Sequence, residues 1–289
     1  MKLFFLTGPG RSGTTILSKY LATHQNCELA YEPPFLFFLF DAYSSNKISK
    51  DIFFKLYDSY LEYDFLFESL SGRRINTNTN DDSTVYSYLS ALEVEFRLSR
   101  SHMLDKDLLD KAQHHNVILK MPGMAYIIRH FLEFKHRQTN LAIIRNPYDN
   151  IKSLCQKEWF TDEGLRSGRI YPLGSNSVGK IVPFWALEYT DEFIKMTNNE
   201  RAALYVYCEL LAILHSKCPV VFYEELVMSA AYRNSLCSSL GLIPTSMTKL
   251  MDSKFYNSSI GEVISTFSPC KYSQLSVDIY KSLKDISFL

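Results

Sequence analysis

The first 23 residues place a strand, a glycine-rich loop and a helix in immediate succession, and this order constrains the fold more than any other feature of the chain. Leu3–Thr7 is a short apolar run, Gly8–Thr15 (GPGRSGTT) carries three glycines, and Thr14–Thr23 is expected to be helical. In such a setting the backbone N–H groups of the loop and the positive end of the helix face one anion. The sequence therefore predicts an α/β protein with a phosphate-binding loop after its first strand.

Further apolar runs of similar length predict strands that are buried on both faces of a parallel sheet. These runs are Asn116–Lys120, Leu141–Ile144 and Pro219–Tyr223. Helical stretches separate or follow them, at Asn150–Lys157, Glu200–His215 and Ala230–Leu240. Strands that alternate with helices indicate a three-layer, P-loop-type α/β fold in one domain over residues 1–289. Asp41–Lys111 is predicted to be a mostly helical insertion between the first and second of these four strands.

Two polar, turn-rich stretches interrupt this alternation. Ser71–Ser83 (SGRRINTNTNDDS) is predicted to be a surface loop. Thr161–Val182 contains several glycines and a proline. Because long loops inside a compact domain are commonly functional, we expect Thr161–Val182 to take part in the site.

The glycine-rich loop departs from the nucleoside-triphosphate pattern GxxxxGK[ST] at one position. Gly8, Gly13 and Thr15 fit the pattern, but Thr14 stands where the lysine that reaches the β- and γ-phosphates belongs. Arg11 instead places a cation inside the loop, and a guanidinium suits bidentate binding of a phosphate or sulfate. This exchange argues against an ATPase, a GTPase or a simple kinase.

The run RSGTT after an apolar strand resembles the 5′-phosphosulfate loop of the sulfotransferases that use 3′-phosphoadenosine-5′-phosphosulfate (PAPS). The resemblance implies that one set of loop residues cradles the phosphosulfate. These residues are Gly10, Arg11, Ser12, Gly13, Thr14 and Thr15.

Two later segments resemble the parts of that family that hold the rest of the nucleotide. Ile143–Leu154 (IIRNPYDNIKSL) is similar to the 3′-phosphate motif, which implies that Arg145 and Ser153 bind the 3′-phosphate. Arg145 lies at the carboxyl end of a predicted strand, where α/β folds bind ligands, and Ser153 lies two turns into the helix that follows. Val221–Leu226 (VFYEEL) resembles a segment near the adenine, and Tyr223 is the candidate for the adenine contact.

A fourth segment, Leu119–Pro122 (LKMP), resembles the K-x-P that ends a strand in many members of the family. The resemblance places Lys120 beside the bridging oxygen of the leaving phosphate. An ammonium group suits this place, because negative charge develops on the leaving oxygen. We therefore expect Lys120 and Arg11 to act together in catalysis.

The residue that accepts the proton of the acceptor is predicted to be Glu32. The phenol and steroid enzymes use a histidine two residues after the lysine, and here that position is Pro122. Glu32, in the run AYEPP, resembles the glutamate base of the tyrosylprotein and carbohydrate sulfotransferases. Ser265 and Ser268 are candidates for a further contact with the leaving group.

Composition excludes several other classes of protein. The chain of 289 residues has 31 basic and 31 acidic residues, so its net charge of zero argues against a nucleic-acid binder. Its apolar runs are far shorter than the ~20 residues of a membrane span, and no secretory leader is recognisable. The six cysteines form no CxxC pair, and no His or acidic cluster has metal-ligand spacing. We therefore expect a cytoplasmic protein with reduced thiols and no metal.

Together these segments predict a PAPS-dependent sulfotransferase that sulfates a hydroxyl or an amine of a small-molecule acceptor, such as a natural product or a toxin. Asp41–Lys111 and Thr161–Val182 are expected to build the acceptor site and its lid. The flanking aromatic residues Trp159, Phe160, Phe184 and Trp185 are candidates for the pocket lining. A peptide tyrosine or a carbohydrate as acceptor, a P-loop kinase, and an inactive nucleotide-binding scaffold remain alternatives, and the oligomeric state is left open.

Overall fold

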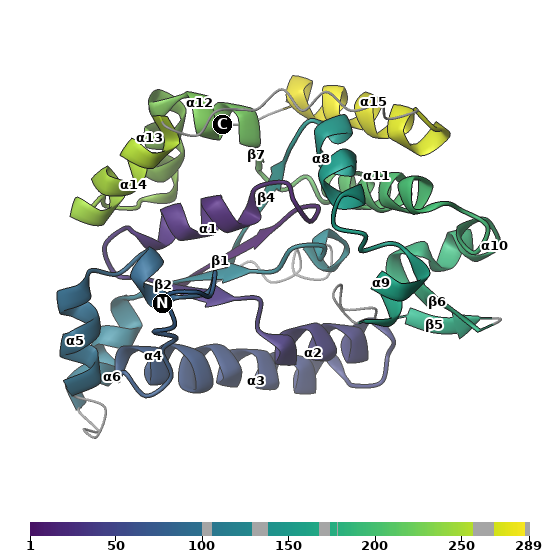
Figure 1. Ribbon diagram of the computed structural model, residues 1–289. Coiled ribbons are helices and arrows are strands. Elements are labelled where there is room, and N and C mark those ends of the chain that lie inside the picture. Colours follow the sequence, from purple (N-terminus) through teal and green to yellow (C-terminus); the bar gives the residue numbers. More distant parts are fainter. Residues whose placement is uncertain (100–105, 129–137, 168–173, 178, 257–268, 287–289) are drawn as a thin grey trace.

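The centre of the molecule is a sheet of five parallel strands in the order β2-β3-β1-β4-β7. The computed structural model describes residues 1–99, 106–128, 138–167, 174–177, 179–256 and 269–286 (Figure 1). The strands are β1 (Lys2–Thr7), β2 (Cys27–Tyr31), β3 (Asn116–Lys120), β4 (Gln138–Ile144) and β7 (Val220–Phe222). A separate antiparallel hairpin consists of β5 (Gly174–Ser177) and β6 (Lys180–Pro183).

Helices cover both faces of the sheet, so the fold has the three layers that the sequence predicts. In Figure 1, α1, α13 and α14 lie on one side and α2 and α3 on the other. The α-helices are α1 (Thr14–Ala22), α2 (Pro34–Ser44), α3 (Lys50–Ser59), α4 (Glu68–Leu70), α5 (Ala91–Ser99), α6 (Lys106–His114), α8 (Pro147–Cys155), α9 (Asp162–Arg166), α10 (Thr190–Phe193), α11 (Asn198–Ser216), α12 (Tyr223–Met228), α13 (Ala230–Leu240), α14 (Ser246–Tyr256) and α15 (Lys271–Ile286).

Shorter helical turns complete the layers. They are the π-helix η1 (Tyr60–Phe67) and the 3₁₀ turns η2 (Val85–Ser87), η3 (Ala125–Ile127) and η4 (Phe184–Tyr189). Among the described helices, none has the length and apolar character that a membrane-spanning segment needs.

The alternation of side chains along β1 explains why its apolar run is continuous. Phe4 and Leu6 belong to the core cluster that contains Leu17 of α1. Leu3 and Phe5 point to the opposite face, into the cluster formed with α2, α3, α11 and α15. A strand with a helical layer on each face needs apolar residues at every position.

The parallel sheet has one strand more than the four that the sequence predicts. Cys27–Tyr31 is a fifth strand at the edge of the sheet, so the helical region after it lies between β2 and β3. The last strand ends at Phe222, and Tyr223 begins α12 instead of ending a strand. The stretch Thr161–Val182, interpreted as a loop, contains α9 and most of the β5–β6 hairpin. Ser71–Ser83 has no helix or strand, as expected of a loop.

Candidate active site

One cavity of about 610 Å³ opens at the carboxyl edge of the sheet. Because all five strands run parallel, their carboxyl ends meet at this edge, which is where α/β folds place their ligands. Each strand delivers lining residues at its end or just after it. The residues delivered in this way are Gly10 and Arg11 after β1, Tyr31 and Glu32 at β2, Lys120 at β3, Arg145 after β4 and Tyr223 after β7.

The residues that line the cavity fall into two sets, which are called the donor end and the acceptor end after the roles proposed for them below. The donor end contains the glycine-rich loop, the start of α1, Arg145 and Tyr223, with Lys19, Asp82 and Met251 at its rim. The acceptor end contains aromatic and apolar side chains, namely Phe37, Met124, Trp159, Phe160, Phe184, Trp185 and Tyr205. Glu32 and Lys120 also line this cavity.

At the donor end, the start of α1 offers backbone donors to a ligand. The N-cap residue Gly13 gives no side-chain cap, and the N–H groups of Thr14, Thr15 and Ile16 bond to no described acceptor. Gly13 has a φ of +103°, and a Cβ placed there would lie 2.4 Å from Cδ2 of Tyr223. Only glycine therefore fits at position 13 of the loop, beside Tyr223. The loop has the form of a cradle for an anion.

Three contacts from distant elements hold the loop in place. The backbone N–H of Gly123, just after β3, donates to the carbonyl of Gly8 at 2.9 Å. The side-chain amide of Asn150, on α8, donates to the carbonyl of Gly10 at 2.7 Å. The hydroxyl of Tyr205, on α11, accepts from the N–H of Gly10 at 2.8 Å. The loop is thereby fixed before any ligand binds.

Neither Asn150 nor Tyr205 was predicted from the sequence. Asn150 lies three residues before Ser153, so it shares a helix face with a predicted site residue, and that spacing is a signal that points to it. Tyr205 lies in a mostly apolar stretch of α11, where the sequence pattern indicates a core residue.

The structure joins the predicted nucleotide-binding residues in two pairs. The Nε of Arg11 donates to Oγ of Ser153 at 3.2 Å, so Ser153 contacts the loop and is not among the residues that line the cavity. The guanidinium of Arg145 lies over the ring of Tyr223, 5.1 Å from its centroid, and both residues line the donor end.

Ser12 belongs to the loop but is not among the described residues that line the cavity. Its side chain is buried, and its hydroxyl has no hydrogen-bond partner among the described residues. The candidates Ser265 and Ser268 lie outside the described residues.

Glu32 and Lys120 form an ion pair between their side chains. The Lys120 side chain is 2% exposed and its ammonium lies 3.7 Å from the centroid of the Tyr31 ring, whereas the Glu32 side chain is 31% exposed. Glu32 has a φ of +46°, and its N–H donates to the carbonyl of Lys120 at 3.1 Å. A left-handed conformation is unfavourable for a glutamate, and such strain concentrates at functional sites.

Aromatic rings form a continuous wall at the acceptor end. The Tyr205 ring contacts Phe160 and Trp185, with centroids 5.2 Å away in both cases, and Phe160 and Trp185 are 5.8 Å apart. Trp159 reaches the loop, because a Cβ on Gly10 would lie 3.1 Å from its Cζ3. The expected lining residues Trp159, Phe160, Phe184 and Trp185 all lie on the cavity.

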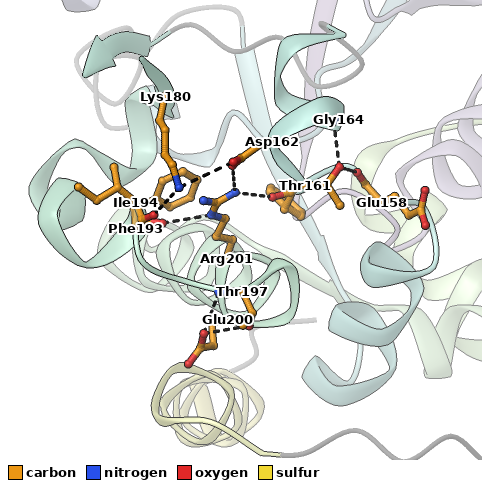
Figure 2. A network of polar contacts seen from close by, with 11 residues as sticks. Glu158, Thr161, Asp162, Gly164, Lys180, Phe193, Ile194, Thr197, Glu200 and Arg201 are labelled. Carbon is orange, nitrogen blue, oxygen red and sulfur yellow. Dashed lines mark hydrogen bonds and ion pairs between the residues drawn. The ribbon is translucent and has the colours of Figure 1, made fainter. Parts of the chain in front are cut away.

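A buried arginine binds the backbone of Phe160, one residue of this wall, and Figure 2 shows the polar contacts of this arginine. Arg201, near the start of α11, donates from Nε to the carbonyl of Phe193 at 3.1 Å and from Nη1 to that of Phe160 at 3.0 Å. Nη1 also lies 2.7 Å from the carboxylate of Asp162, which Lys180 approaches to 3.7 Å. We call this group the Arg201 hub. It ties the backbone of Phe160 to α11.

Comparison with known proteins supports the fold. No family model matches the sequence, and no curated protein does. A sulfotransferase domain from the curacin biosynthetic pathway matches over 98% of this chain and 97% of its own, with a TM-score of 0.51 and 15% sequence identity. The chain has the fold of a sulfotransferase domain. A sulfotransferase domain from the Synechococcus PCC 7002 olefin synthase matches over 98% and 94% of the two chains, at 15% identity, with a TM-score of 0.47.

At this identity the likeness concerns the fold alone, so the reaction must be inferred from the side chains of the site. The fold agrees with the resemblance that the four sequence segments suggest.

Proposed function

We propose that the protein is a sulfotransferase that moves a sulfuryl group from PAPS to a hydroxyl, or an amine, of a small and largely apolar acceptor. The observation that supports this most directly is the single cavity in which an anion-binding loop, the Lys120–Glu32 pair and an aromatic wall meet. Each of the three has a separate task in sulfuryl transfer.

The donor end has the chemistry that the donor requires. When bound, PAPS supplies an activated sulfuryl group. The free N–H groups at the start of α1 and the guanidinium of Arg11 suit its 5′-phosphosulfate. Arg145 suits the 3′-phosphate, and the Tyr223 ring beside it offers a surface for the adenine. Gly10, Ser12, Gly13, Thr14 and Thr15 complete this assignment.

Glu32 and Lys120 divide the proton and charge chemistry between them. The carboxylate of Glu32 accepts the proton that the acceptor hydroxyl loses as it attacks sulfur. The ammonium of Lys120, with Arg11 and the loop amides, stabilises the negative charge that develops on the leaving phosphate oxygen. The products are a sulfated acceptor and 3′-phosphoadenosine 5′-phosphate (PAP).

The acceptor end favours an uncharged molecule. Apart from Glu32 and Lys120, its described lining residues carry no charge, and most of them are aromatic. A carbohydrate would need several polar partners, which the described residues of this wall do not supply. A flat apolar alcohol of natural-product size fits the lining better. Asp41–Lys111 contributes Asp82 at the rim, and its role in the acceptor site and lid, like that of Thr161–Val182, remains a proposal.

The first experiment measures thermal stability with PAP and, in parallel, with ATP and Mg²⁺. A ligand that binds only the folded state raises the melting temperature by mass action. We expect a clear rise with PAP and little with ATP, followed by release of PAP from PAPS when a panel of aryl and alkyl alcohols is added. A rise with ATP and Mg²⁺ alone would instead indicate a kinase. Binding of PAP without turnover on any acceptor would indicate a nucleotide-binding scaffold.

A further inference from the structure

The hydroxyl of Tyr205 lies where the two ends of the cavity meet. Tyr205 is 6% exposed and lines the cavity, and its Oη accepts the hydrogen bond from the backbone N–H of Gly10 at 2.8 Å. Gly10 immediately precedes Arg11. A side chain from α11 is therefore bonded to the phosphate-binding loop itself.

The proton of this hydroxyl has no acceptor in the described part of the protein. A phenol both accepts and donates hydrogen bonds, and Gly10 uses only an acceptor position. Burial holds the pKa of Tyr205 well above its usual range, and the nearby carboxyl group of Glu209 raises it further, so the oxygen keeps its proton. A buried donor without a partner is destabilising. A molecule bound in the cavity can accept this hydrogen bond.

One glycine and two aromatic rings fix the position of the hydroxyl oxygen. A Cβ on Gly123 would lie 2.8 Å from Oη, so glycine leaves room for the oxygen there. On the other side, Phe160 and Trp185 contact the ring. The position of the donor is thus set before a ligand binds.

We propose that the Tyr205 hydroxyl donates a hydrogen bond to a non-bridging oxygen of the transferred sulfuryl group and so acts as a catalytic residue. This inference rests on the function proposed above. Because Gly10 anchors the hydroxyl to the loop, the hydrogen bond would orient the sulfuryl group relative to Glu32 in the same cavity. It would also stabilise charge on the sulfuryl oxygens without reorganisation of the protein.

The test compares binding of PAPS and of PAP, which differ only in the sulfuryl group, to the wild-type protein and to Tyr205→Phe. Phenylalanine keeps the ring between Phe160 and Trp185 and removes only the hydroxyl. By calorimetry we expect PAPS to bind roughly five- to tenfold more weakly and PAP to bind within about twofold of wild type. With PAPS and 2-naphthol as the probe acceptor, kcat should fall roughly 10- to 100-fold.

Tyr207→Phe is the matched control. Tyr207 lies on the same helix, but its ring faces Tyr272 of α15 at 5.5 Å, away from the cavity lining. It should leave both affinities and kcat unchanged.

Other outcomes separate the possible errors. If Tyr205→Phe weakens PAP and PAPS equally, the hydroxyl only braces the loop and the proposal is wrong. If it changes neither affinity nor kcat, the proposal is equally wrong. If the wild-type protein binds neither nucleotide, the proposed function itself fails.

Discussion

One buried arginine lies beside each end of the cavity, and the two arginines make the same kinds of contact. At the acceptor end, the Arg201 hub binds two backbone carbonyls and one carboxylate. Beside the donor end, Arg233 of α13 donates to the carbonyls of Leu226 at 2.8 Å and Val227 at 3.2 Å, and to the carboxylate of Asp252 at 2.7 Å. Arg201 holds the segment that carries Phe160, and Arg233 holds α12.

The two ends differ in the parts of the chain that these arginines hold in place. In the proposed function, the donor end binds through backbone groups of the loop and through Arg11, Arg145 and the Tyr223 ring, which lies against Gly13. The acceptor end is lined mainly by aromatic residues from segments far apart in the sequence. A binding site built partly of backbone groups depends on glycines and local geometry, whereas a site built mainly of aromatic side chains depends on the packing behind them. Substitutions should therefore separate donor binding from acceptor binding.

The largest effect is expected at Glu32, which belongs to neither end alone. Glu32→Gln should lower kcat by about 10²- to 10⁴-fold, because the amide cannot accept the acceptor's proton. PAP affinity should stay within about threefold of wild type. Steady-state kinetics and calorimetry measure the two quantities. Glu225→Gln, an exposed glutamate on α12, is the control that should change neither. Unchanged turnover in Glu32→Gln would remove Glu32 from the role of base.

Next in size are the two arginines, which test the comparison itself. Arg201→Met and Arg233→Met each leave two buried backbone carbonyls without their charged donor, so each should lower the free energy of unfolding by about 3 kcal/mol. In denaturant titrations the two losses should be similar. The functional effects should differ: Arg201→Met should raise the KM of the acceptor, and Arg233→Met should weaken PAP. If both variants changed both constants alike, the two ends would not be separable.

The donor end was largely predictable from the sequence because its signals are local. A strand, three glycines and a helix follow one another in 23 residues, and the structure places the loop and α1 where this order predicts. Strands β1, β3 and β4 were found from apolar runs, which a strand buried on both faces requires.

The sequence did not predict strand β2 or the position of Tyr205 on the cavity. Both depend on contacts with residues that are distant in the sequence. Glu28 interrupts the apolar pattern of β2, yet it is fully buried. It is tolerated because Arg97 lies 2.6 Å from one carboxylate oxygen and Ser69 donates to the other at 2.9 Å. The contact that gives Tyr205 its role comes from Gly10, 195 residues earlier. Neither pairing leaves a trace in local periodicity.

A smaller effect is expected from Arg145, and it tests the donor end alone. Arg145→Ala should weaken PAP by about 2 kcal/mol, or roughly 30-fold, as expected for the loss of a charge-assisted hydrogen bond. Binding of AMP, which lacks the 3′-phosphate, should not change. Arg166→Ala, an exposed arginine on α9, should affect neither ligand. If AMP weakened as much as PAP, Arg145 would contact another part of the nucleotide.

The smallest effect concerns Glu209, one turn after Tyr205 on α11. Burial raises its pKa to about 8, although the N–H of Ala125 donates to it at 3.3 Å. An unfolded chain releases this proton near pH 4.5, so between about pH 4.5 and 8 unfolding releases a proton and stability falls as the pH rises. The neutral amide in Glu209→Gln removes this dependence. The difference in unfolding free energy between variant and wild type should therefore grow in the variant's favour by about 1 kcal/mol from pH 6 to pH 7.

The turn that Ala125 begins follows the cavity residue Met124. PAP affinity measured over the same pH range therefore also tests whether the two ends of the cavity are independent. Because the phosphates of PAP also titrate at about pH 6, the affinity must be compared between the wild-type protein and Glu209→Gln. If Glu209 acts on the acceptor end alone, the two proteins should show the same pH profile of PAP affinity. A difference that grows between pH 6 and pH 8 would show that the two ends are coupled through this turn.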